Sequence, residues 1–172
     1  IFKLVSLETN TELPKDLIIT KEFLEAFKVM NETSKNVFIT GNAGTGKSTL
    51  LEYFREKTKK NTAIVAHQGI TALKAKGQTI HSLFKFPIHF VTKKDVKTLR
   101  DRELVRRLDT LIIEEASMVG ADIFDAIDIS LKKNRSIDKP FGGVQIILFG
   151  DVMQLDPIIG GEEELYEKFY PD

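Results

Sequence analysis

The sequence contains no cysteine, and this and other scarcities narrow the classes of protein it can belong to. Without cysteine, disulfides, thiol catalysis and cysteine-ligated zinc are excluded. The three histidines, His67, His81 and His89, are too few and too scattered to predict a metal cluster. No apolar run approaches the roughly 20 residues of a membrane-spanning helix, and the start IFKLVSLETN does not resemble a signal peptide. We therefore expect an intracellular protein with no membrane partner, in the cytoplasm or nucleoid if its source is bacterial.

Net charge is also absent, because 25 basic residues are balanced by 25 acidic ones. A nucleic-acid partner would have to be bound by a local patch rather than by a global positive field. The 172 residues, of which 42% are apolar, can fill one core, so we expect a single compact domain. Since the chain begins at Ile1 and stops at YPD after a helical pattern, we expect it to be a piece of a longer protein.

Short apolar runs alternate with amphipathic stretches, which is the pattern of an α/β domain with a parallel sheet flanked by helices. The candidate strands show little alternation, as expected for strands buried on both faces. They are residues 36–40, 62–66, 110–114 and 144–149. Apolar residues recur at helical spacing in residues 21–30 and 121–135, and again in the basic run 93–108, so helices are predicted there.

The first candidate strand leads directly into the glycine-rich segment GNAGTGKST. The spacing from Gly41 to Gly46, followed by Lys47 and Ser48, matches the phosphate-binding loop of nucleotide-binding proteins. Lys47 would reach the β- and γ-phosphates, Ser48 would bind Mg²⁺, and a helix beginning near Lys47 would point its positive end at the anion. A glycine-rich turn that binds nothing is the alternative. The predicted nucleotide-contacting residues are Gly41, Asn42, Ala43, Gly44, Thr45, Gly46, Lys47, Ser48 and Thr49.

Two further candidate strands end in groups that suit phosphate chemistry. LDTLIIEEASMV places Glu114 and Glu115 at a strand end, where one carboxylate can meet Mg²⁺ and the other can orient or deprotonate water. Two adjacent acids favour a hydrolase over a nucleotide kinase, and a solvated strand end is the alternative. Asp151 and Gln154 follow the apolar strand in VQIILFGDVMQLDPI. The Gln154 amide can hydrogen-bond a γ-phosphate, and an ordinary polar loop is the alternative.

Four stretches together, GNAGTGKST, AHQGITALKAKGQTIHSLF, LIIEEASMV and GDVMQLDPI, resemble the ordered motifs of the Pif-type DNA helicases, relatives of RecD in helicase superfamily one. The resemblance implies a RecA-like domain that binds ATP and Mg²⁺. In this family, two such domains move 5′ to 3′ on single-stranded DNA and unwind duplexes at forks, with roles in DNA repair, recombination and telomere maintenance. Residues 1–172 match the first domain, so a second RecA-like domain of the same protein is an expected partner.

The resemblance also assigns roles to individual residues. Lys47, Glu115 and Gln154 are implied to be catalytic, and Ser48 and Glu114 are implied to bind the metal. Contacts to single-stranded DNA are implied for Gly69, Thr71, Thr79, His81 and Ser82. Hydroxyl, imidazole and N–H groups suit that role because they can bond phosphates without reading bases.

Other interpretations apply to several of these side chains. A buried histidine is the alternative for His81, and core packing is the preferred interpretation of Phe84 and Phe86. The basic run 93–108 is a weaker DNA candidate, since most charge runs are solvated faces.

This sequence departs from the family pattern at three places. Glu114 stands where Asp is usual, which displaces the carboxylate by about 1.5 Å. Phe23 occupies the place of a Gln that reads adenine in the family, so adenine selectivity is not predicted. His67 and Gln68 replace the usual Pro and Thr.

Three functions from different classes follow from these features. TIHS and GDVMQL favour a helicase motor domain, whereas the phosphate loop alone also suits a DNA-independent switch or protein-remodelling ATPase. A nucleotide-binding module with little activity is the third, because of Phe23 and because motifs of a second domain are not found in these residues.

Overall fold

The computed structural model describes residues 19–42, 44–151, 153, 167–168 and 170. Its strands form one parallel sheet in the order β1-β5-β4-β2-β3. The strands are β1 (Val37–Thr40), β2 (Thr62–Ala66), β3 (Gln78–Thr79), β4 (Thr110–Glu114) and β5 (Gln145–Gly150). The α-helices are α1 (Lys21–Glu32), α2 (Lys47–Lys57), α3 (Gly69–Lys74), α4 (Ile80–Phe84), α5 (Glu103–Arg107) and α6 (Ala121–Arg135). Two short 3₁₀ turns, η1 (Ala116–Met118) and η2 (Pro140–Gly143), follow β4 and precede β5.

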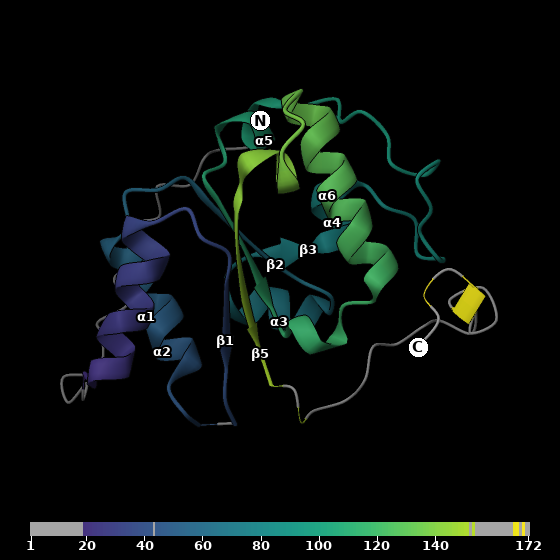
Figure 1. Cartoon of the computed structure of the whole chain (residues 1–172). Helices are drawn as coiled ribbons and strands as arrows, with labels where there is room; N and C mark the ends of the chain where they lie inside the picture. Colours follow the sequence, from purple (N-terminus) through teal and green to yellow (C-terminus); the bar gives the residue numbers. More distant parts are fainter. Residues whose placement is uncertain (1–18, 43, 152, 154–166, 169, 171–172) are drawn as a thin grey trace.

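The helices cover both faces of the sheet (Figure 1), so β4 and β5 are buried from two sides, whereas the edge strand β1 alternates half-buried and exposed residues. Consecutive side chains of a strand point to opposite faces. In β4, Ile112 therefore packs with α1 and α2, while Leu111 and Ile113 pack with α4, α5 and α6. This two-sided burial explains why β4 and β5 read as continuous apolar runs in the sequence.

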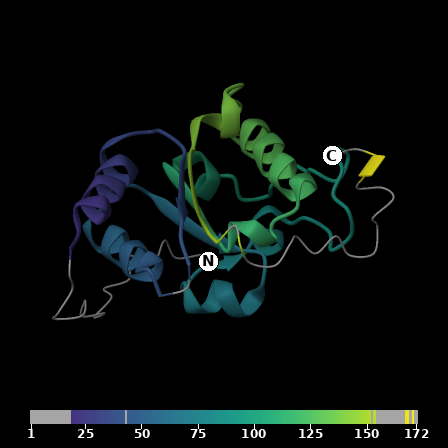
Figure 2. The ribbon, with the colours of Figure 1, turned by 60° about the horizontal axis from the view of Figure 1, so that its bottom comes forward.

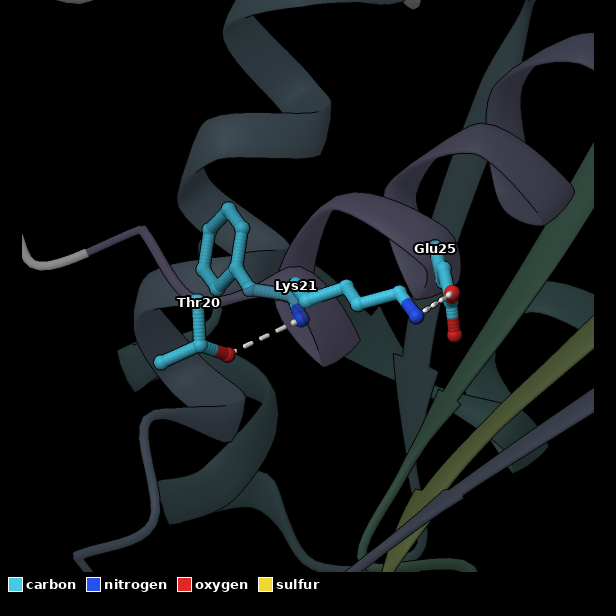
Figure 3. A network of polar contacts seen from close by, with 4 residues as sticks. Thr20, Lys21 and Glu25 are labelled. Atoms are coloured by element: carbon cyan, nitrogen blue, oxygen red, sulfur yellow. Dashed lines mark hydrogen bonds and ion pairs between the residues drawn. The ribbon is translucent and has the colours of Figure 1, made fainter.

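Helix α1 begins at a capping residue and has an ion pair on its exposed face (Figure 3). The Thr20 hydroxyl oxygen accepts a hydrogen bond from the Phe23 N–H at 3.2 Å, which satisfies a donor that the first helical turn leaves unpaired. Lys21 Nζ lies 3.8 Å from Glu25 Oε1 one turn later. Both groups are exposed, so this pair contributes little to stability.

Most predicted elements are confirmed with small shifts at their ends. β2, β4 and α6 have the predicted bounds, β1 begins one residue later at Val37, and β5 is shifted by one residue. The helix after the phosphate loop begins at Lys47, as expected. β3 was not predicted, because it contributes only two residues, Gln78 and Thr79, to the sheet.

The helix predicted over the basic run 93–108 is wrong, since only α5 is helical there. In the segment before α5, backbone N–H groups donate hydrogen bonds to side-chain oxygens. The Asp95 carboxylate accepts from the Thr92 N–H and hydroxyl at 2.9 and 2.7 Å, and the Leu99 N–H donates to Asn134 Oδ1 of α6 at 2.8 Å. The apolar spacing thus reflects irregular chain packed on α6 rather than a helical period.

Parallel strands bring all their carboxyl ends to one edge of the sheet. That edge lies at the bottom of Figure 1, where β1 and β5 end, and is turned forward in Figure 2. Within the described part of the chain, no helix has the length and apolarity to cross a bilayer.

Candidate active site

The phosphate loop connects β1 to α2 at the carboxyl edge and folds back on itself. Gly44 and Gly46 have φ angles of 79° and 89°, a left-handed conformation that side chains disfavour. The Thr45 hydroxyl donates to the Asn42 carbonyl oxygen at 2.9 Å and closes the turn. The glycines are therefore required by the path of the loop.

Lys47, the first residue of α2, reaches back over this loop. Its ammonium group donates to the carbonyl oxygens of Gly41 and Asn42, the second at 2.9 Å. The positive charge is thereby held at the mouth of the loop, next to the backbone turn that the glycines form.

A cleft of about 390 Å³ opens beside the loop and combines the ends of β4 and β5 with the start of α2. It is lined by Gly44, Gly46, Lys47, Ser48, Thr49, Glu114, Glu115, Phe149, Gly150 and Asp151. The structure thus brings together the predicted phosphate, metal and water-orienting residues. Ala43 and Gln154 were also predicted here, but both lie outside the described residues.

Glu114 and Glu115 place two carboxylates side by side at the end of β4. Burial raises the pKa of Glu114, the neighbouring Glu115 raises it further, and the Lys47 ammonium opposes both effects. A partly buried pair of acids facing one ammonium group is a place where a cation is favourable, so the residues present fit a divalent ion.

Glu115 has an unusual backbone and a specific side-chain partner. Its φ and ψ are 51° and 50°, the left-handed region, at the point where β4 turns into η1. Its Oε2 accepts a hydrogen bond from the Thr71 hydroxyl of α3 at 2.9 Å. The carboxylate is therefore held between the cleft and the helix after β2.

Asp151, at the end of β5, lines the cleft and was noticed in the sequence without being assigned a role. It is buried, and its Oδ1 accepts from the Met153 N–H at 3.0 Å. The signal that could have identified it is its position directly after an apolar strand, the same signal that identified Glu114 and Glu115.

Phe23 lies at a second hollow, of about 420 Å³, where α1, β1 and the phosphate loop meet. Its ring packs edge-on against Tyr53 of α2, with the centroids 5.4 Å apart. Phe38 and Thr40 of β1 line the same hollow. The lining of this hollow therefore mixes two aromatic rings, Phe23 and Phe38, with polar side chains such as Thr20 and Glu22.

The predicted DNA contacts fall into two groups on the segments after β2. Gly69 and Thr71 lie on α3. The other group surrounds the start of α4, where the Thr79 hydroxyl oxygen accepts from the Ser82 N–H at 3.1 Å. Thr79 thus caps a helix, whether or not it also contacts a ligand.

His81, in the second group, is half-buried and lies edge-on to His67 with ring centroids 5.7 Å apart. Burial lowers the pKa of His81, His67 lowers it further, and Asp122 opposes the shift. Phe84 and Phe86 are buried and stacked on each other with centroids 5.3 Å apart, which confirms the packing interpretation for both.

Comparisons with known proteins agree with the motifs. A family model described as PIF1-like helicase matches residues 18–168. The ATP-dependent DNA helicase PIF1 of Emericella nidulans is 36% identical over 146 residues, which cover 78% of this chain and 20% of that protein. The ATP-dependent DNA helicase Pif1 of a Psychrobacter species is 38% identical over 148 residues, covering 80% of this chain and 22% of that one.

A solved structure shows the same architecture. The crystal structure of Pif1 helicase from Bacteroides in complex with ADP-AlF3 and ssDNA superposes with a TM-score of 0.84 at 41% identity, covering 91% of this chain and 38% of that one. The predicted RecA-like α/β fold is confirmed. The chain spans about a fifth of the length of the two curated relatives. With a family model matched over most of its residues and relatives 36% and 38% identical over more than three quarters of its length, the chain belongs to the PIF1-like helicase family.

Proposed function

We propose that this chain is the first motor domain of an ATP-dependent helicase that moves 5′ to 3′ on single-stranded DNA and unwinds duplexes. The observation that carries the proposal is the convergence of Lys47, Ser48, Glu114 and Glu115 on one cleft beside a glycine-rich loop. Family membership supports it, because the named relatives are ATP-dependent DNA helicases.

The residues around the cleft divide the work of hydrolysis. Lys47 exchanges its carbonyl partners in the loop for phosphate oxygens, while the backbone N–H groups from Gly41 to Thr49 cradle the phosphates. Ser48 and Glu114 would hold Mg²⁺, which neutralises charge on the phosphates when bound. Glu115 orients the attacking water and accepts its proton, and Gln154 hydrogen-bonds the γ-phosphate.

The hollow beside Phe23 is the proposed place of the nucleotide base. It adjoins the phosphate loop through Thr45 and Lys47, and its aromatic lining offers stacking surface. A phenyl ring has no group that reads the hydrogen-bonding edge of a base. We therefore expect any discrimination of adenine to come from the polar side chains that also line the hollow, such as Thr20 and Glu22, rather than from Phe23.

The DNA strand would run over α3 and the start of α4, contacting Gly69, Thr71, Thr79, His81 and Ser82. Ser82 and Gly69 are exposed there, and the segment offers hydroxyl, imidazole and backbone donors together with the exposed lysines Lys74, Lys76 and Lys85. A second RecA-like domain of the same protein is the proposed partner that closes on both nucleotide and strand, at forks as well as on single strands.

A calorimetric titration with ATP and Mg²⁺ tests the nucleotide assignment. Lys47→Ala is expected to weaken binding at least about tenfold, because a charge-assisted contact to phosphate is lost. Lys59→Ala removes an exposed lysine and serves as the matched control. Equal affinities of wild type and Lys47→Ala would refute the proposed site. If the full-length protein hydrolyses ATP without stimulation by single-stranded DNA, the function is instead a DNA-independent ATPase.

A further inference from the structure

A hydrogen bond joins the proposed DNA-binding segment to the proposed water-orienting residue. The Thr71 hydroxyl on α3 donates to Glu115 Oε2 at 2.9 Å, although the two residues are 44 positions apart in the sequence. Both side chains are half-buried, so water competes less strongly for this bond than it does at an exposed site.

The order of the strands determines from which side Thr71 approaches the Glu115 carboxylate. β2 and β5 lie on opposite sides of β4, and the phosphate loop follows β1 on the far side of β5. Thr71 belongs to the helix after β2, so it holds the Glu115 carboxylate from the side away from the phosphate loop. Glu115 nevertheless lines the nucleotide cleft, so a small rotation would turn its carboxylate toward that loop.

The chemistry of a hydroxyl makes the bond exclusive. Threonine has one hydroxyl hydrogen and can donate it to one strong acceptor at a time. A phosphate oxygen placed on α3 would therefore compete with Glu115 for the hydrogen of Thr71. When the Thr71 hydroxyl donates to a phosphate instead, the Glu115 carboxylate loses its hydrogen-bond partner on α3. It can then accept a hydrogen bond from water in the cleft.

We propose that Thr71 is a positioning residue that restrains Glu115, and that a backbone phosphate of single-stranded DNA releases it. The inference rests on the proposed function, in which α3 follows the strand and Glu115 orients the water. Under this proposal, the rate of ATP hydrolysis depends on bound single-stranded DNA through the Thr71 hydroxyl. This dependence does not require the two domains to move.

The test measures ATP turnover of the full-length protein with no DNA present. Thr71→Val keeps the shape of the side chain but removes the donor, and it is expected to raise kcat about 3- to 10-fold while leaving the KM for ATP unchanged. Thr71→Ser restores the hydroxyl and should return kcat to within about twofold of wild type. Thr62→Val, at the amino end of β2 and away from the cleft, is the matched control and should have the wild-type kcat.

A second pair of measurements separates restraint from a general structural effect. In the Glu115→Gln background, Thr71→Val should no longer raise turnover, because the group through which it acts is missing. Saturating oligothymidylate should stimulate Thr71→Val by a smaller factor than wild type, since its restraint is already absent. Unchanged or lower DNA-free turnover of Thr71→Val in an enzyme that DNA stimulates would overturn the inference. Absence of stimulation in wild type would instead refute the proposed function.

Discussion

The imidazole of His81 shows how one residue at the carboxyl edge affects stability. Its pKa is lowered from 6.5, chiefly by burial and then by His67. The unfolded chain therefore takes up a proton more readily than the folded one as the pH falls below about 6.5. The contribution of His81 to the free energy of unfolding therefore decreases over that range and down through its folded pKa.

We predict that replacing His81 by Gln removes this part of the acid sensitivity. Urea unfolding from about pH 8 to about pH 5 should show wild type losing stability relative to His81→Gln as the pH falls. Lys59→Ala, at an exposed position, is the control and should keep the wild-type dependence. Parallel pH curves for wild type and His81→Gln would contradict the lowered pKa.

At the same scale, residue type and position could be read from the sequence, but pairing could not. The loop glycines, Lys47 and the adjacent acids were identified because each follows a strand at a fixed spacing. The bond from Thr71 to Glu115 was not predicted, since it depends on β2 and β4 lying side by side. Local patterns contain no information on which strands become neighbours.

Among the elements, a polar anchor ties the amino ends of the strands together opposite the candidate active site. Lys60 Nζ, before β2, donates to the Met30 carbonyl of α1 at 2.7 Å and to Gln145 Oε1 of β5 at 2.7 Å. Gln145 is 2% exposed, and its amide also bonds the Lys35 carbonyl and the Thr110 hydroxyl. One buried amide thus links α1, β4, β5 and the segment before β1.

We predict that Gln145→Leu destabilises the fold by about 1–3 kcal/mol, because the Thr110 hydroxyl loses a partner in a buried place and Lys60 and the Lys35 carbonyl each lose one in a partly buried place. Equilibrium urea unfolding measures the change, with an unaltered denaturant slope indicating an unaltered unfolded state. Lys59→Ala, which is exposed and adjacent to Lys60, is the control. A loss no larger than that of the control would show that the anchor contributes little.

Element boundaries were predictable where burial was simple and unpredictable where it was not. Strands covered on both faces gave continuous apolar runs, and α6 gave a full helical period with acids at its start and basic residues at its end. The run 93–108 gave a similar period, but before α5 it packs as irregular chain, in which the Asp95 carboxylate bonds the preceding Thr92 N–H and the Leu99 N–H donates to Asn134 of α6. Apolar spacing reports burial, and burial alone does not identify a helix.

For the molecule as a whole, the candidate site occupies one edge of one sheet. A phosphoryl-transfer site gains about 10³ to 10⁵ in turnover from an arginine placed against the developing charge. In the proposed motor that arginine comes from the second domain. One domain also provides only half of a groove for a DNA strand.

We therefore predict that residues 1–172 alone bind nucleotide, hydrolyse it very slowly and do not separate strands. Turnover and fork unwinding by the purified chain should be compared with those of the full-length protein, with Lys47→Ala as the inactive control. Single-strand binding should weaken with salt at a slope of about −0.7 per phosphate contacted. Robust strand separation by the purified chain would show that the motor is complete in these residues or assembles from identical copies.

Because Glu115 has a left-handed backbone conformation, the residue that would be most stable at this position differs from the residue that catalysis needs. A side chain in that conformation costs about 1–2 kcal/mol, and glycine would remove most of the cost. Glycine would also remove the carboxylate that the proposed chemistry needs. A search for thermostable variants that ignores turnover should accumulate glycine at position 115, whereas a search that demands hydrolysis should keep the strained acid.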